Sequence, residues 1–331
     1  MSMRICSATA ALLASAVLGG VAWAPAAHAR PAQVGLAWIP TCTERSGITV
    51  PCPTWRLLAP GGGVTTSSAV AGVSVDRRGR STGEAAPLAV SADGRSVAHQ
   101  RSGDHRLVVW HLPSGRRTLL PRSLLPKGAG TDLVSLTLSP AGDRVLVDYL
   151  DQAERVPTKL YTLATRRTSD LRGGDTPIGF SPGGDRVLTE RVTADNTTAL
   201  VVHEPDGTSV RRTPPQVVAN APVKALARDG RTVAVVVSGH PERGKPPRLR
   251  LYDLATGKLT EGVDLALAPG DTPFTARWGE GGKLTVAVPG RGKGGTAVVR
   301  VLTADPATGA VKQTERYTTG KDPYFYTVAG E

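Results

Sequence analysis

The sequence predicts an all-β fold, a β-propeller of six four-stranded blades whose ring is closed by strands from both chain ends. Three observations predict it. A polar, glycine-containing turn recurs five times, and a hairpin of similar composition follows each turn at a constant place in the repeat. Beyond the first 29 residues, no stretch shows an apolar pattern of period 3.6 long enough for a helical domain.

The recurring turns each separate two short apolar strands, as in SPAGDRV and SPGGDRV. They begin at Ser91, Ser139, Ser181, Ala227 and Gly279, with spacings of 48, 42, 46 and 52 residues. Self-similarity at this period with four short strands per repeat is typical of propeller blades.

A hairpin between the third and fourth strands of each unit is the second marker. The hairpins span 107–120, 160–171, 201–213, 249–262 and 298–315. Pro, Asp and Gly between apolar runs favour tight turns. The mean spacing of 47 residues divides the 302 residues that follow position 29 into about six units, of which five are visible. We expect the sixth to combine strands between Trp55 and about Ala85 with the C-terminal run Tyr324–Val328, because closure from both ends protects sheet edges.

The S-P-x-G turns and the LYDLATGKLT hairpin resemble the repeats of TolB-like, WD-repeat-like bacterial β-propellers. The resemblance covers residues 85–316 and implies the propeller fold. It implies no single function, because such blades serve as scaffolds, receptors and enzymes. We expect no counterpart of the separate N-terminal α/β domain of TolB itself, because the predicted repeats leave no room for it in this sequence.

Residues 1–29 are predicted to be a secretory signal peptide. Arg4 precedes an apolar run from Ala10 to Trp23, and Ala27-His28-Ala29 forms a small-x-small cleavage site. The run is too short to span a bilayer, so we expect cleavage after Ala29 and a secreted or envelope-associated protein. No later segment is apolar enough to span a membrane.

Residues 30–53 show no sustained periodicity and are predicted to form an irregular N-terminal segment, followed by the propeller at 54–331. Two cysteines, Cys42 and Cys52, remain after export, and an even number in an exported protein predicts a disulfide. A metal pair is the alternative, but no partner ligands lie nearby in the sequence.

The formal net charge is +12. A basic exported protein can associate with anionic wall polymers, lipid head groups or nucleic acid. The excess of arginine over lysine in a chain rich in Ala, Gly, Val and Pro is also what GC-biased codon usage produces. Aromatic residues are sparse, so binding of nucleic acid is not expected.

In a propeller, the second-to-third and fourth-to-first connections share one face, and in this chain these connections are long and varied. Binding residues concentrate in such loops, so we expect the functional face there. The candidate binding residues are His99, Arg101, Asp104, His105, His240, Arg243, Arg291 and Lys293. A metal site built from the histidines is conceivable, but solvated loop histidines are the simpler interpretation, since metal sites need three or four converging ligands.

A second candidate surface is a basic rim formed by Arg-Arg pairs that begin the outer strand of three consecutive blades. The pairs are Arg116 and Arg117, Arg166 and Arg167, and Arg211 and Arg212. They suit a polyanion whose affinity falls with salt. Alternatively, the charges only prevent edge-to-edge aggregation of outer strands.

These observations favour an exported, non-enzymatic propeller that binds a protein or an anionic envelope component through its long loops, with no cofactor or metal. A polyanion binder using the basic rim is one alternative. A hydrolase or lyase with a site at the mouth of the central channel is another, although the inner strands offer only Lys224 and Arg277 as charged residues.

Overall fold

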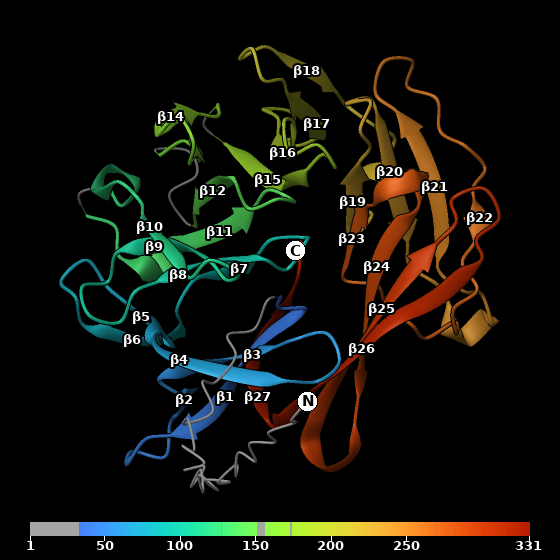
Figure 1. Cartoon of the computed structure of the whole chain (residues 1–331). Coiled ribbons are helices and arrows are strands. Elements are labelled where there is room, and N and C mark those ends of the chain that lie inside the picture. Colours follow the sequence, from blue (N-terminus) through green and yellow to red (C-terminus); the bar gives the residue numbers. More distant parts are fainter. Residues whose placement is uncertain (1–32, 127, 151–155, 173) are drawn as a thin grey trace, which may run out of the picture.

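The computed structural model describes residues 33–331 except 127, 151–155 and 173. The predicted signal peptide at 1–29 lies outside the described residues. The described chain is all-β and forms six four-stranded antiparallel blades, which confirms the predicted fold class. Figure 1 shows the blades arranged as a ring, with the C-terminus near its centre.

Five blades follow one another along the chain, and in each the strands pair in sequence order from the inner to the outer edge. Blade 2 contains β7 (Leu88–Val90), β8 (Ser96–Gln100), β9 (Leu107–His111) and β10 (Arg116–Leu119). Blade 3 contains β11 (Val134–Leu138), β12 (Arg144–Tyr149), β13 (Lys159–Thr162) and β14 (Arg167–Asp170). Blade 4 contains β15 (Asp175–Phe180), β16 (Val187–Val192), β17 (Thr198–His203) and β18 (Ser209–Arg212). Blade 5 contains β19 (Val223–Leu226), β20 (Thr232–Val237), β21 (Arg248–Asp253) and β22 (Val263–Asp264). Blade 6 contains β23 (Thr275–Trp278), β24 (Leu284–Arg291), β25 (Thr296–Ala304) and β26 (Val311–Lys321).

Blade 1 closes the ring with strands from both chain ends. The C-terminal strand β27 (Pro323–Val328) is innermost and is followed by β1 (Leu36–Thr43), β3 (Thr54–Leu58) and β4 (Val64–Ala71). Leu36 in β1 lies opposite both Val328 in β27 and Leu58 in β3. Closure by the C-terminal run Tyr324–Val328 was therefore predicted correctly.

The prediction that residues 30–53 are irregular was wrong. This segment contains β1, the second strand of blade 1, and β2 (Thr49–Pro51), which pairs with the end of β1. Leu36 to Ile39 are buried in succession, so β1 lacks the alternation that marks a half-buried strand, and a bulge at Pro40 interrupts the pairing. The hairpin formed by β1 and β2 projects from blade 1, and we call it the β1–β2 excursion. The predicted disulfide is present and links Cys42 to Cys52 across this excursion, with 5.0 Å between the two Cα atoms.

The predicted sixth unit also extended too far along the chain. Beyond β4, residues 73–85 form a separate hairpin of β5 (Val73–Val75) and β6 (Ser81–Ala85) outside the blades. The remaining elements are single helical turns in the connections: η1 (Arg122–Leu124), η2 (Thr131–Leu133), α1 (Gln216–Ala219), η3 (Pro241–Arg243), η4 (Glu280–Gly282) and η5 (Lys293–Gly295). No described helix has the length and apolar character that a bilayer crossing requires.

The repeated turn is explained by its hydrogen bonds and by its packing against the preceding blade. The Ser139 hydroxyl donates to Asp143 over 2.6 Å and accepts from the backbone N–H of Arg144 over 2.9 Å. Gly142 has a φ of +70°, and a Cβ there would lie 2.4 Å from the Cβ of Ser96 in blade 2. Glycine is therefore required both by the left-handed backbone and by the close approach of neighbouring blades.

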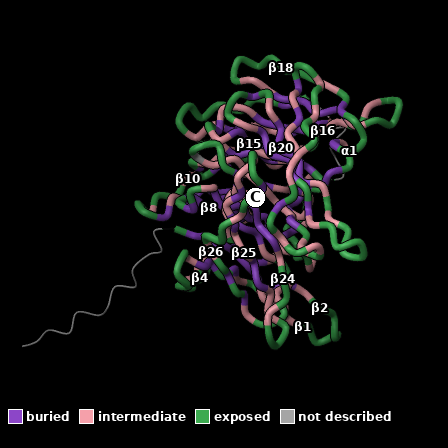
Figure 2. Tube along the Cα trace, turned by 90° about the vertical axis from the view of Figure 1, so that its right-hand side faces the viewer, coloured by how far each residue is buried: buried purple, intermediate pink, exposed green. Residues whose placement is uncertain are grey.

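Each interface between neighbouring blades has its own apolar cluster, and the clusters together form the core. Figure 2 shows the buried residues in the interior of the molecule and exposed residues in the outer loops. The cluster between blades 3 and 4 is the smallest. Its fully buried members are Leu146, Leu171 and Val187, and polar side chains occupy much of the same interface.

The connections define two faces. The short-turn face carries the first-to-second and third-to-fourth connections, including the five repeated turns. The long-loop face carries the second-to-third and fourth-to-first connections, as expected: 101–106, 150–158, 193–197, 238–247 and 292–295 join second to third strands. The β1–β2 excursion, the β5–β6 hairpin and the tip of the long β24–β25 hairpin all extend this second face.

Candidate functional site

His99 does not lie in a loop. It belongs to β8, its side chain is only 1% exposed, and its Nδ1 donates to the carbonyl oxygen of Gln100 over 2.8 Å. Burial lowers the pKa of His99 to about 4, so the ring is uncharged at neutral pH. The interpretation of this residue as a solvated loop histidine was wrong, because β8 extends two residues further than the polar sequence around it indicates.

The loop after β8 is held by an ion pair. Nε of Arg101 donates to Oδ1 of Asp104 over 2.7 Å, and this contact lowers the pKa of Asp104 to about 2. His105 adopts a φ of +57°, and its Nδ1 accepts from the Gln100 amide over 3.2 Å. Asp104 and His105 line a cavity of about 270 Å³ between blade 2 and the β5–β6 hairpin, opposite Asp76.

The other predicted loop residues belong to different blades. His240 and Arg243 are exposed in the connection of blade 5, where the His240 ring nitrogen lies 3.3 Å from a Glu242 oxygen. Arg291 and Lys293 are exposed at the tip of blade 6. The structure therefore does not join these residues to the blade 2 loop in one cluster. In the described ranges there is no group of three His, Cys, Asp or Glu side chains placed to hold a metal ion.

A groove on the long-loop face lies between the β24–β25 hairpin and blade 1. It has a volume of about 830 Å³, and Thr41, Arg291, Asp322 and Tyr326 are among the residues that line it. Sequence reasoning identified only Arg291 of these four, because the groove forms only when the β24–β25 hairpin meets both the C-terminal strand and Thr41, which lies 250 residues earlier than Arg291.

Exposed large apolar side chains are concentrated on the same face. Phe325, in the first half of the innermost strand, is 50% exposed, and Ile48, in the β1–β2 connection, is 60% exposed. Leu150, Val192 and Val217 lie at the long-loop ends of β12 and β16 and in α1. Toward the short-turn face the exposed large apolar residues include Val64 and Val210, at the starts of β4 and β18.

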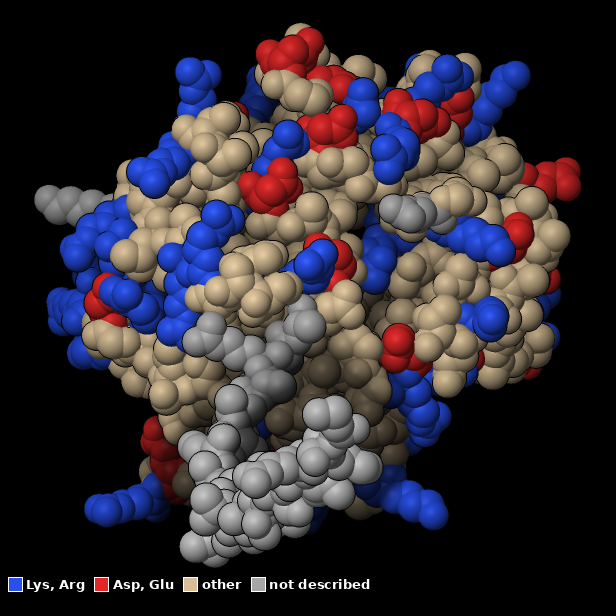
Figure 3. Space-filling model, in the orientation of Figure 1, with Lys and Arg blue, Asp and Glu red and all other residues tan. Residues whose placement is uncertain are grey.

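The six arginines of the predicted basic rim differ in their roles. Arg212 is part of the framework, because its Nη2 donates to the Ala255 carbonyl of the next blade over 2.5 Å. The Arg117 guanidinium stacks 4.8 Å above the Trp110 ring. Arg116 and Arg166 line a groove of about 560 Å³ between blades 2 and 3. Arg167 and Arg211 are exposed on their outer strands. Figure 3 shows Lys and Arg gathered at the edge of the molecule that carries β9 and β10.

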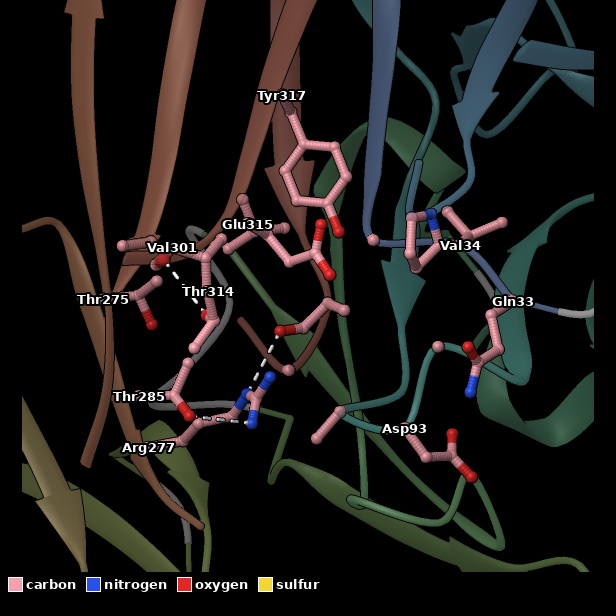
Figure 4. A pocket seen from close by; sticks show the side chains of 18 of the residues that line it. Gln33, Val34, Asp93, Thr275, Arg277, Thr285, Val301, Thr314, Glu315 and Tyr317 are labelled. Carbon is pink, nitrogen blue, oxygen red and sulfur yellow. Dashed lines mark hydrogen bonds between the residues drawn. The ribbon is translucent and has the colours of Figure 1, made fainter. Parts of the chain in front are cut away.

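A further groove, of about 250 Å³, lies on the short-turn face at the seam where blade 1 meets blade 6. Figure 4 shows Arg277, Glu315 and Tyr317 from blade 6 on one side of it, and Gln33, Val34 and Asp93 on the other. Burial raises the pKa of Tyr317 to about 12. Sequence reasoning recorded Arg277 only as an isolated charge in an inner strand, since the groove depends on closure of the ring.

Arg277 and Lys224 also line an axial cavity of about 250 Å³ between β15, β19 and β23. The positive charge of Lys224 is compensated. Its Nζ lies 2.6 Å from Oε1 of Glu190 and donates to the carbonyl oxygens of Ala219 and Ala221 over 3.0 and 2.7 Å. Lys224 is therefore a framework residue.

A buried polar network occupies the interface of blades 3 and 4. Arg191 binds both carboxylate oxygens of the fully buried Asp175, through Nε and, over 2.6 Å, through Nη2. His203 Nε2 lies 3.0 Å from the same carboxylate and 3.1 Å from the Thr189 hydroxyl. Because one ring nitrogen makes both contacts, His203 cannot relay a proton between Asp175 and Thr189 as in a catalytic triad.

The sequence matches no known family model and no curated protein. Solved structures of similar fold include a chain of the nidogen/laminin complex (14% identity, TM-score 0.48, covering 89% of this chain and 98% of that one). They also include a putative TolB from Agrobacterium tumefaciens (11%, 0.48, 88% and 91%) and the β-propeller domain of the Trilobed protease from Pyrococcus furiosus (11%, 0.48, 86% and 81%). The TolB-like resemblance predicted from the turns thus reappears among these structures, while strand pairing within the chain itself establishes the fold.

Proposed function

We propose that this chain is an exported, non-enzymatic propeller that binds a protein of the cell envelope on its long-loop face. The observation that carries the proposal is that most of the exposed large apolar side chains of the described residues lie on that face. Phe325 and Ile48 are half or more exposed in blade 1, which also forms one wall of the 830 Å³ groove. Apolar side chains exposed beside a groove are typical of protein interaction sites.

The rigidity of this region supports the same role. Tyr324, next to Phe325, donates from its hydroxyl to Oε2 of Glu84 over 3.1 Å and so links the innermost strand to the β5–β6 hairpin. The Cys42–Cys52 disulfide holds the excursion that carries Ile48. Residues fixed in this way lose little conformational entropy on binding. The disulfide and the predicted signal peptide both support an extracytoplasmic location.

The test is a capture experiment with the chain from residue 30 onward, immobilised and exposed to envelope extract. We expect one protein to be retained through a high-salt wash, and to be lost when Phe325→Ser and Ile48→Asp are combined. Val210→Asp is the matched control, because Val210 is similarly exposed near the opposite face. Retention that survives the double substitution, or that is lost equally with the control, would contradict the proposal.

Binding of an anionic wall polymer is a second candidate, favoured by the position of Arg116 and Arg166 in one groove. It predicts retention at low salt that falls steeply as salt rises, because phosphate or carboxylate contacts release counterions. The variant R116Q/R166Q should abolish that retention, whereas R212Q should instead lower stability. Undiminished polymer binding by R116Q/R166Q would exclude this groove.

A further inference from the structure

Arg277 lies where two cavities meet. It lines both the groove at the seam of blades 1 and 6 and the axial cavity bounded by β15, β19 and β23. Gly330, which precedes the last residue, packs directly against it: a Cβ at that position would lie 2.5 Å from Cδ of Arg277. The side chain is thereby held in place by the last residues of the chain.

The hydrogen bonds of Arg277 leave part of its guanidinium group free. Nε donates to the Ala329 carbonyl oxygen over 3.2 Å, and Nη1 makes a long contact of 3.4 Å with the Thr285 hydroxyl. Throughout the described part of the chain, no carboxylate lies within ion-pair distance of Arg277, and its hydrogen bonds involve Nε and Nη1 but not Nη2. Burial lowers the pKa of Arg277, but a guanidinium remains protonated in proteins.

Arg277 is partly buried, and a partly desolvated cation without a counterion is unfavourable, because its desolvation is not offset by an opposite charge. The cost falls when an anion binds beside it. The planar fork of donors matches a carboxylate in particular, which can accept two parallel hydrogen bonds. The free edge of Arg277 is therefore suited to a ligand carboxylate.

The rest of the groove indicates what accompanies that carboxylate. Glu315 and Asp93 supply negative charge, and Figure 4 shows Glu315 directed toward the same space as Arg277. Val34, Val301 and Val328 contribute apolar wall. A volume of about 250 Å³ is near the lower limit of small-molecule sites, so the ligand is no larger than a dipeptide.

We propose that the seam of blades 1 and 6 binds a small amino-carboxylate, an amino acid or dipeptide, with its carboxylate on Arg277 and its ammonium group toward Glu315. This site lies on the face opposite the proposed protein-binding surface, so each proposal can be tested without the other.

The test is an NMR titration of the full chain from residue 30 with three probes: alanylalanine, its N-acetyl derivative and its C-terminal amide. We expect alanylalanine to cause saturable shifts at the Nε–H of Arg277 and the amides of Thr285 and Gly330. The amide should cause none, because it lacks the carboxylate. The acetylated probe represents a protein C-terminus without a nearby ammonium group, and we expect it to bind more weakly.

Substitutions test the roles of Arg277 and Glu315 in binding separately. R277Q should weaken alanylalanine binding at least tenfold and R277K less, whereas R243Q on the opposite face should not change it. E315Q should weaken alanylalanine but not the acetylated probe, a difference that a general structural defect would not produce. Saturable binding that survives R277Q, or no saturable shift with any probe, would overturn the site. Equal affinity for the free and acetylated probes would overturn the role of Glu315.

Discussion

Two seams between blades contain a partly buried arginine, and they differ in how its charge is compensated. Between blades 3 and 4, Arg191 is bound to both oxygens of the buried Asp175, and His203 contacts the same carboxylate. Between blades 6 and 1, Arg277 has only a carbonyl and a hydroxyl as partners in the described structure, and it borders two cavities.

This difference indicates that Arg191 stabilises the fold, whereas Arg277 is available to bind a ligand. The blade 3–4 interface has the smallest apolar cluster of the ring, and the paired charges take the place of apolar packing there. The closing seam already has apolar packing from Leu36, Trp38 and Val299, so the fold does not need a charge at Arg277. A partly buried charged group that the fold does not need, beside two cavities, indicates a ligand site.

The largest effect is expected from breaking the compensated pair. Asp175→Ala leaves Arg191 buried without its counterion and should lower the free energy of unfolding by about 3–5 kcal/mol. Urea denaturation of the variant measures this. Asp195→Ala, in an exposed turn of the same blade, is the control and should change stability by less than about 0.5 kcal/mol. A loss of the same size in both variants would show that the network has no special role.

The covalent link of blade 1 should have the next largest effect. Replacing both Cys42 and Cys52 by serine removes a constraint on a short loop and should lower stability by about 2–3 kcal/mol in the chain-entropy model. The comparison is between the oxidised wild type and the double variant in urea. Because the disulfide lies on the long-loop side of blade 1, alanylalanine binding at Arg277 should persist. Loss of that binding would show that the two ends of the closing blade are coupled.

A smaller effect is expected from pH. Burial alone would raise the pKa of Asp175, but hydrogen bonds from His203 and Arg191 outweigh it, and the net pKa lies below the ordinary value of 3.8. A carboxyl group with a depressed pKa in the fold contributes stability that is complete above its unfolded pKa and is lost as pH falls through its folded pKa. Wild-type stability should therefore decline below about pH 4, and Asp175→Asn should make that decline shallower in acid-unfolding curves. An unchanged slope would contradict this assignment.

The sequence was sufficient to predict the features that repeat along the chain. It was not sufficient to predict the features that form only once. The Ser-x-x-Gly turns and the hairpins are local, so their spacing predicted five blades and both faces. The strand β1 was missed because Leu36 to Ile39 are buried on both sides and show no alternation. His99 was misplaced for a related reason, since a polar residue in a short, fully buried strand looks like the start of a loop. The Arg277 groove depends on β27, β1 and β26 meeting at ring closure, and no local pattern contains that information.

The central claim is tested most directly by measuring, in one denaturation series, the unfolding free energies of Arg191→Met and Arg277→Met. Each substitution removes a guanidinium group from a blade seam and leaves an apolar chain. We predict a loss of about 3–5 kcal/mol for Arg191→Met, because the buried Asp175 carboxylate loses both hydrogen bonds from Arg191 and keeps only its contact with His203. For Arg277→Met we predict a change within about 1 kcal/mol, since removal of an uncompensated charge offsets the two lost hydrogen bonds. A loss for Arg277→Met as large as that for Arg191→Met would mean that both arginines hold the fold together, and would contradict the distinction between a structural seam and a binding seam.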